Sequence, residues 1–107
     1  MQSLTPRELH QKIRSGQAQI TVLDVREPWE TRIARLEGCV FAPLSTFGTE
    51  IVDDLPDDRD VVVLCHHGVR SAMVTQWLEQ NGRERVFNLS GGIDEWSRTI
   101  DPSLPRY

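Results

Sequence analysis

Short runs of apolar residues, rich in valine and isoleucine, recur along the chain and predict buried strands. The strongest is Val61–Leu64, which is apolar at every position and follows a polar turn. Ile20–Leu23 and Val86–Leu89 show the same pattern, whereas Val40–Ala42 is a weaker prediction. Strands without a polar face are typical of a mostly parallel sheet whose two faces are both covered by helices.

Helical patterns alternate with these runs. The first begins at Thr5, whose side chain can cap a helix, and Pro6 fits its first turn while Glu8 can complete a capping box. Gly16 is the residue that ends this helix. A second helix is predicted over Leu44–Leu55, where apolar residues recur every three or four positions.

Two further helices follow the strongest strand. Ser71 is the predicted N-cap of one, which ends at Asn81–Gly82. Its predicted apolar stripe comprises Met73, Val74, Trp77 and Leu78. A short last helix follows Ser90–Gly92 and runs through Trp96. This alternation predicts an α/β fold, with one mostly parallel central sheet and helices on both faces, formed by a single domain over residues 1–107.

Composition narrows the range of functions. The 107 residues carry a net charge of −4, which argues against a general nucleic-acid or anionic-membrane binder. No apolar run approaches the ~20 residues of a membrane span, and the first residues have no signal-peptide core, so we expect a cytoplasmic protein. The two cysteines, Cys39 and Cys65, form neither a C-x-x-C pair nor a secreted-type framework, so we expect reduced thiols.

Cys65 directly follows the strongest strand, and ligands of α/β sheets bind at the carboxyl ends of strands. The segment from Cys65 to Arg70 joins this strand to the amino end of a helix, so its backbone N–H groups and the helix dipole can face the thiol. Such surroundings, with His66, His67 and Arg70 as candidate cations, lower the pKa of a cysteine and make it a nucleophile. Gly68 suits a tight loop that needs a residue with positive φ.

Other interpretations of these residues stay open. A cysteine after a strand is often only a small buried hydrophobe, and the two histidines can be solvent-facing loop residues. A metal site of Cys65, His66 and His67 is disfavoured, because adjacent residues of an extended loop point apart and no further ligand cluster is evident. Cys39 is expected to be a packing residue, with a resolving thiol as the alternative.

Four segments in order resemble the motifs of one family. Residues 23–30 (LDVREPWE) are similar to a D-V-R-E-x-x-E segment, and residues 38–43 (GCVFAP) resemble a G-A-x-x-x-P turn. Residues 65–71 (CHHGVRS) match a C-x-x-G-x-R-S active loop, and residues 89–96 (LSGGIDEW) match L-x-G-G-x-x-x-W. Nearly the whole chain thus resembles a single-domain rhodanese, a sulfurtransferase family. Arg35 stands where the family often has histidine, and Cys39 replaces the usual alanine.

The resemblance implies a double displacement. Cys65 would take the outer sulfur of an anionic donor such as thiosulfate, carry it as a persulfide, and yield it to cyanide or a thiol, with a sulfur-accepting protein as a further candidate partner. No cofactor or metal is implied, and neither nucleic acid nor membrane is an expected partner. Arg70 would meet the donor, whereas Asp24, Arg26 and Ser71 would support the site. The terminal sulfur would be held by the backbone N–H groups of the loop, those of His66, His67, Gly68, Val69 and Arg70.

Two alternatives remain for such a domain. Rhodanese-like phosphatases also use a cysteine and an arginine, but their loop resembles C-x-x-x-x-x-R, which is one residue longer than the segment from Cys65 to Arg70. A shorter loop makes a smaller anion cradle, which favours sulfur over phosphate. Rhodanese-like domains also serve as binding or regulatory modules, and some of these lack the cysteine that this chain has.

Overall fold

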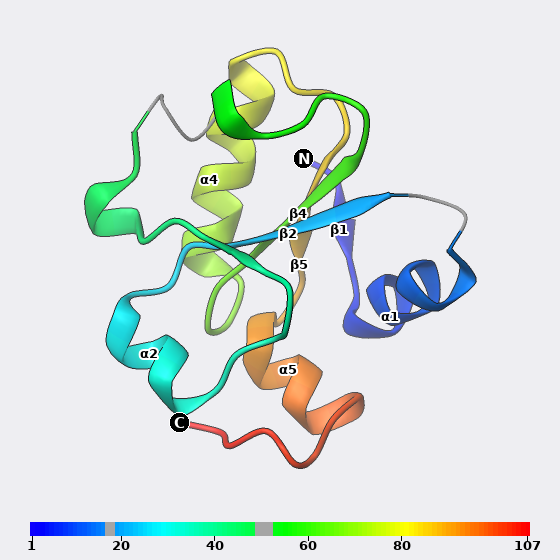
Figure 1. Ribbon diagram of the computed structural model, residues 1–107, viewed down its shortest axis with the longest axis vertical. Helices are drawn as coiled ribbons and strands as arrows, with labels where there is room; N and C mark the ends of the chain where they lie inside the picture. The colour runs from blue at the N-terminus through cyan, green and yellow to red at the C-terminus, as the bar shows by residue number, and fades with distance from the viewer. Residues whose placement is uncertain (17–18, 49–52) are drawn as a thin grey trace.

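The computed structural model describes residues 1–16, 19–48 and 53–107, which form a five-stranded sheet with every strand pair parallel (Figure 1). The strand order is β1-β5-β4-β2-β3, so β4 lies at the centre, between β5 and β2. The strands are β1 (Ser3–Leu4), β2 (Ile20–Asp24), β3 (Val40–Phe41), β4 (Asp60–Leu64) and β5 (Val86–Leu89). The predicted parallel α/β sheet is therefore confirmed, including its weaker strand.

Helices cover both faces of this sheet. They are α1 (Pro6–Ser15), α2 (Pro28–Ile33), the 3-10 turn η1 (Leu44–Thr46), α4 (Val69–Gln80) and α5 (Gly92–Thr99). Successive side chains of a strand point to opposite faces, so β4 contributes to two cores. Val63 packs in one core with Leu78 of α4, and Val62 packs in the other with Leu9 of α1 and Trp96 of α5. Within the described ranges, no helix is long and apolar enough to cross a membrane.

The predicted first helix is confirmed together with both of its ends. The N–H of Thr5 donates to Glu8 Oε1 at 2.9 Å, and the N–H of Glu8 donates to Thr5 Oγ1 at 3.2 Å, which completes the capping box. Gly16 adopts the left-handed conformation, with φ 65°, that ends α1. Local sequence was sufficient here because every contact that defines these ends lies within one helical turn.

Two elements of the structure had no counterpart in the predictions. The strand β1 has two residues, which is too short for an alternating pattern. The helix α2 lacks an apolar stripe, because it exposes Trp29 and Ile33 and buries Glu30 instead. A helix that buries a carboxylate and exposes its large apolar residues gives no hydrophobic periodicity, so this helix could not be predicted from the pattern of apolar residues.

The prediction of one continuous helix over 44–55 is wrong. Leu44–Thr46 forms a single 3-10 turn, and Phe47 is extended, with ψ 134°. The ring of Phe47 packs edge-on against Trp77 at 5.4 Å between ring centroids, and the hydroxyl of Ser45 donates to Glu27 at 2.5 Å. These tertiary contacts hold Ser45 and Phe47 away from a continuous α-helix, whereas residues 53–54, near the end of the predicted range, are helical. Residues 49–52, which include part of the predicted stripe, lie outside the described residues.

The predicted start and stripe of the helix after Cys65 also need correction. Ser71 is not its cap, because α4 begins at Val69 with Gly68 at the N-cap position, φ 100°. Ser71 is fully buried within the first turn. Val74 and Leu78 of the predicted stripe lie in the core and Trp77 packs against it, whereas Met73 is 60% exposed. The helix therefore turns a partly polar face, not a purely apolar one, toward the site that follows β4.

Candidate active site

Cys65 lies at the carboxyl end of the central strand β4, and its side chain is 1% exposed. The N–H of Gly68 donates to Cys65 Sγ at 3.1 Å. The thiol itself donates to Ser71 Oγ at 3.3 Å, and the hydroxyl of Ser71 donates onward to Asn88 Oδ1 at 2.5 Å. Cys65, Gly68 and Ser71, all predicted site residues, are thus brought into one hydrogen-bonded group.

Asn88 completes this group from the neighbouring strand β5. Its amide Nδ2 donates to Gly68 O at 3.2 Å, so the same side chain fixes both the loop and the hydroxyl next to the thiol. Asn88 was missed as a functional residue. Its signal was present in the sequence, since it is the polar residue in the apolar run Val86–Leu89, and a buried amide there needs polar partners.

The first turn of α5 supports the loop from the other side. Ile93 N–H donates to Cys65 O at 2.9 Å, and Asp94 N–H donates to His66 O at 3.1 Å. The two segments approach so closely that a Cβ on Gly92 would lie 2.4 Å from His66 O and 2.5 Å from Cys65 O. Gly92, the second glycine of the last motif, therefore permits this close approach of α5 to the loop.

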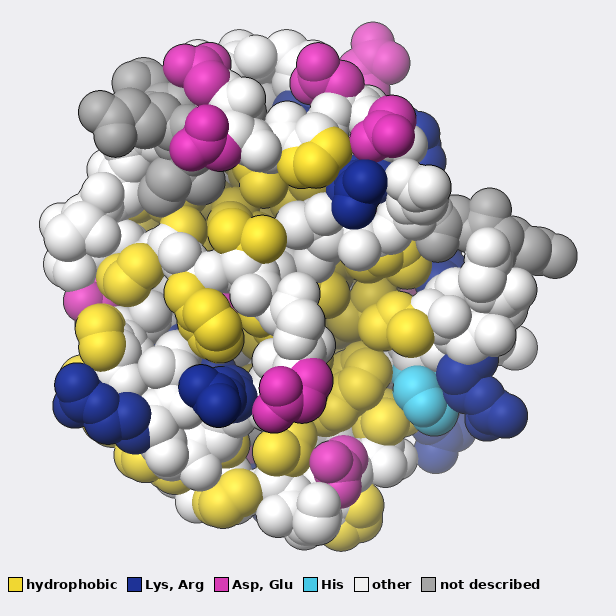
Figure 2. Space-filling view, viewed as in Figure 1, with side chains coloured by type: hydrophobic (Ala, Val, Ile, Leu, Met, Phe, Trp, Pro, Cys, Tyr) yellow, Lys and Arg dark blue, Asp and Glu magenta, His cyan; other side chains and the backbone are white. Residues whose placement is uncertain are grey.

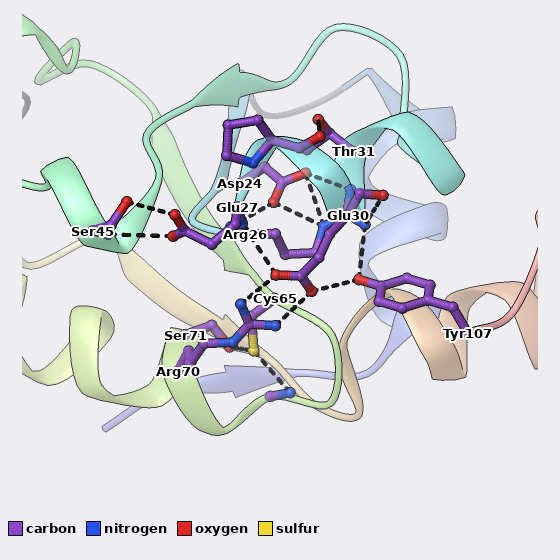
Figure 3. A network of polar contacts seen from close by, with 12 residues as sticks. Asp24, Arg26, Glu27, Glu30, Thr31, Ser45, Cys65, Arg70, Ser71 and Tyr107 are labelled. Carbon is purple, nitrogen blue, oxygen red and sulfur yellow. Dashed lines mark hydrogen bonds and ion pairs between the residues drawn. The ribbon is translucent and has the colours of Figure 1, made fainter.

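Arg70 does not point into open solvent. Its guanidinium binds Glu30 of α2 in a bidentate pair, with Nη1 donating to Oε1 at 2.5 Å and Nη2 to Oε2 at 2.7 Å. The side chain of Glu30 is 3% exposed and that of Arg70 is 32% exposed. Figure 3 shows the hydroxyl of Tyr107 converging on the same carboxylate, to which it donates at 2.7 Å. Arg70, which was predicted to meet an anionic donor, is therefore paired with the carboxylate of Glu30 in this structure.

These contacts set the charge states of the pair. Burial acts to raise the pKa of Glu30, but the hydrogen bonds from Arg70 and Tyr107 outweigh it and lower this pKa to about 2. Burial raises the pKa of Tyr107 to about 12, so its hydroxyl stays protonated. Glu30 appeared in the sequence only as part of a motif, and Tyr107 had no local signal, because its partners lie far away along the chain.

Asp24 and Arg26 form a second ion pair beside the first. Both side chains are fully buried, and Arg26 Nη2 lies 2.7 Å from Asp24 Oδ2. Arg26 Nη1 also donates to the hydroxyl of Tyr107 at 3.1 Å, which connects this pair to Glu30. The position is consistent with the predicted supporting role, and it leaves neither group free to contact a substrate.

His66 and His67 lie together, so the expectation that they point apart is wrong. Their rings stack at 3.8 Å between centroids, and His66 stacks on Tyr107 at 3.9 Å with an interplanar angle of 7°. Burial, followed by the proximity of His67, lowers the pKa of His66. A lowered pKa keeps His66 neutral at physiological pH, so the predicted cationic contribution of this residue loses support.

Cys39 differs from Cys65 in its surroundings. It packs at the edge of the core that contains Leu9 and Trp96. Burial and the negative charge of Asp24 raise the pKa of Cys39 to about 12. A thiol with this pKa is almost entirely protonated at neutral pH, which supports the packing interpretation and disfavours the resolving thiol.

An apolar surface lies beside the loop, on α4 and η1. Val69 is 72% and Met73 60% exposed. A shallow cavity of about 360 Å³ next to them is lined by Leu44, Phe47, Gly48, Met73, Val74 and Trp77. Figure 2 shows apolar side chains spread over the face that it presents, among charged groups of both signs.

The loop that carries Cys65 connects the central parallel strand β4 to the helix α4. The family model described as Rhodanese-like domain matches residues 5–99, so the chain belongs to the rhodanese-like domain family. Rhodanese-like/PpiC domain-containing protein 12, chloroplastic, from Arabidopsis thaliana is 42% identical over 107 residues, which cover 94% of this chain and 35% of that protein. A protein named sulfurtransferase from Allochromatium vinosum is 34% identical over 79 residues, which cover 74% of this chain and 73% of that protein.

A solved structure confirms the fold. A rhodanese-like domain protein from Staphylococcus aureus matches this chain with a TM-score of 0.82 at 28% sequence identity, covering 100% of this chain and 99% of that chain. The chain spans only 35% of the length of the Arabidopsis relative. Similarity to that protein therefore concerns its rhodanese-like part.

Proposed function

We propose that this protein is a sulfurtransferase that carries a sulfane sulfur as a persulfide on Cys65. The observation that carries the proposal is the placement of Cys65 Sγ, which accepts the Gly68 N–H at 3.1 Å just before the 12-residue helix α4. A backbone donor and a helix amino end both stabilise a negatively charged sulfur. The match to the rhodanese-like family and the relative named sulfurtransferase support the same chemistry.

The proposed reaction is a double displacement. The Cys65 thiolate attacks the outer sulfur of a donor such as thiosulfate, the sulfur–sulfur bond of the donor breaks, and sulfite leaves with the bonding electron pair. Cyanide or an acceptor thiolate then attacks the outer sulfur of the persulfide, and Cys65 leaves as a thiolate. Between the two steps, the N–H groups of the loop from His66 to Arg70 are proposed to hold the terminal sulfur.

Arg70 is proposed to bind the anionic donor in the first step. Its guanidinium presents a planar fork that suits the oxygens of an anionic donor. Because Glu30 occupies this fork at 2.5 and 2.7 Å, a donor has to compete with the carboxylate. Cys65 is 1% exposed, so the same displacement of Arg70 is proposed to open a path to the thiol.

The acceptor is proposed to be a small thiol or the thiol of another protein. Val69 belongs to the loop and Met73 follows one turn later on α4, and both expose apolar side chains. A surface of this kind suits contact with a protein. The compartment stays a prediction: the cytoplasm was expected from the sequence, whereas the Arabidopsis relative is named as chloroplastic.

Intact-mass analysis after incubation with thiosulfate tests the proposal. The wild-type protein should gain the mass of one sulfur atom, and later addition of cyanide should remove it with release of thiocyanate. Cys65→Ser should gain nothing, because a hydroxyl does not carry a persulfide. Cys39→Ala is the matched control for the second cysteine and should load like the wild type.

Two other outcomes would overturn the proposal. Hydrolysis of an aryl phosphate that is lost in Cys65→Ser, without any persulfide, would assign the loop to a phosphatase. Failure of thiosulfate and of an organic persulfide to load Cys65 in the folded protein would assign the domain to binding or regulation.

A further inference from the structure

Three side chains that have no assigned part in the proposed reaction lie close together: those of His66, His67 and Asp94. His66 and His67 belong to the loop, and Asp94 belongs to the first turn of α5. Each offers one nitrogen or oxygen that can bind a metal ion, and these atoms all lie within 4.8 Å of one another. His67 Nε2 is 3.9 Å from Asp94 Oδ2.

The backbone fixes the relative positions of the two segments. The N–H of Asp94 donates to His66 O at 3.1 Å, and the N–H of Ile93 donates to Cys65 O at 2.9 Å. On its far side the ring of His66 is stacked on Tyr107. The backbone of Asp94 and the ring of His66 are therefore held in place without a bound ion.

A second observation points to a ligand at this place. His66 Nε2 is buried and has no hydrogen-bond partner among the described residues. An unsatisfied buried nitrogen is unfavourable, and native structures seldom contain one without a water, an ion or a functional reason. Coordination to a metal ion is one of the interactions that satisfy an imidazole nitrogen.

We propose that His66, His67 and Asp94 bind a divalent zinc-like metal ion, with at least one coordination position left open. Two imidazole nitrogens and one carboxylate oxygen are a ligand set that suits Zn²⁺, whereas Mg²⁺ and Ca²⁺ prefer sites made of oxygen atoms. Three protein ligands leave room for water or for an incoming anion. This inference does not depend on sulfur transfer, because the ligands are distinct from Cys65.

Binding requires two local adjustments that the structure permits. Ligand atoms around a tetrahedral zinc ion lie about 3.4 Å apart. The lone pair of an imidazole nitrogen lies in the plane of its ring, so two rings stacked at an interplanar angle of 29° do not both direct a lone pair at one ion, and one ring has to turn. The side chain of His67 is 61% exposed and can turn. Asp94 accepts from Arg106 through both oxygens, Oδ1 from Nε at 2.9 Å and Oδ2 from Nη2 at 3.2 Å, so Arg106 has to release at least one oxygen to the ion.

Zinc titration of metal-free protein in competition with a chromophoric chelator tests the site. The wild type should bind one Zn²⁺ per chain, and His67→Gln and Asp94→Asn should each weaken binding by roughly tenfold or more. The matched controls are His10→Gln, a histidine that contacts Trp96 instead, and Glu95→Gln, the neighbouring carboxylate that pairs with Arg98. Both should bind Zn²⁺ like the wild type.

Cysteine ligation is tested separately. Cys65→Ser should keep the zinc affinity, and Co²⁺ bound to the wild type should lack the near-ultraviolet band of a cobalt–thiolate bond. Affinity that is unchanged in both ligand variants, that is lost in Cys65→Ser, or that is absent from the wild type would each overturn the assignment of His66, His67 and Asp94.

Discussion

The substitution Glu30→Gln removes the charge that holds Arg70 and keeps the size of the side chain. The pKa of Glu30 is about 2 in the folded protein, against 4.5 for the unperturbed group. This difference of about 2.5 units corresponds to about 3 kcal/mol of stability at neutral pH, at about 1.36 kcal/mol per unit. We therefore expect Glu30→Gln to lower the free energy of unfolding by about 2–3 kcal/mol at pH 7.

The sign of the pH dependence follows from the direction of the shift. Because the pKa is lowered on folding, between pH 4.5 and about 2 the unfolded chain binds more protons than the folded one. The stabilisation is therefore complete above this range and is lost as the pH falls through it. By pH 3 the wild type should have lost about 2 kcal/mol of this stabilisation. Glu30→Gln has no carboxyl group at this position, so its free energy of unfolding should not fall for this reason.

Urea unfolding of both proteins at several pH values between 3 and 7 measures the effect. Glu27→Gln is the matched control, because Glu27 also belongs to the start of α2 but makes an exposed contact with Ser45. Such exposed contacts contribute about 0–1 kcal/mol. If the stability difference between wild type and Glu30→Gln is the same at pH 3 and pH 7, the ion pair with Arg70 is not what holds Glu30.

Two further predictions concern the loop itself. Cys65 should react with iodoacetamide at neutral pH much faster than Cys39, because the raised pKa of Cys39 keeps it protonated; equal rates by peptide mapping would refute the activation of Cys65. Gly92→Ala should lower stability by about 3 kcal/mol or more and slow persulfide loading, because its Cβ would meet backbone atoms of the loop at 2.4 Å. Gly82→Ala is the control, because Gly82 also has a positive φ but a Cβ there would have nothing within 4 Å. Urea unfolding should show that this control lowers the free energy of unfolding by only about 1–2 kcal/mol. Similar losses of stability in the two variants would contradict the close approach of α5 to the loop.

Local sequence was informative where local interactions decide the structure. The capping box of Thr5 and Glu8, the apolar run Val61–Leu64 and the glycine before α4 could all be predicted, since each depends on neighbours within a few positions. The helix predicted over 44–55 failed because Phe47 packs on a distant residue instead of continuing a helical turn. Periodicity indicates which residues are apolar, but not which partner they meet.

The partners of the candidate site could not be predicted in the same way. Glu30 and Arg70 are 40 positions apart, and Tyr107 reaches Glu30 across 77 positions. Such pairs leave no periodic trace, and several other carboxylates in the chain are equally plausible partners for Arg70 by charge alone. Asn88 was detectable in principle, since a polar residue inside a buried strand requires a hydrogen-bonding explanation.

The pairing of charges around Cys65 changes how the loop has to stabilise a negative sulfur. Arg26 is bound by Asp24 and Arg70 by Glu30, so neither guanidinium adds a full unpaired charge to the site at rest. The Gly68 N–H donates to Sγ, and the amino end of α4 begins at the next residue, so both can stabilise a negative sulfur without a cation. A persulfide anion can therefore be held without breaking an ion pair, whereas a doubly charged donor gains a cation only by displacing Glu30. Weakening that pair should thus improve the use of anionic donors at the expense of the stability that the pair provides.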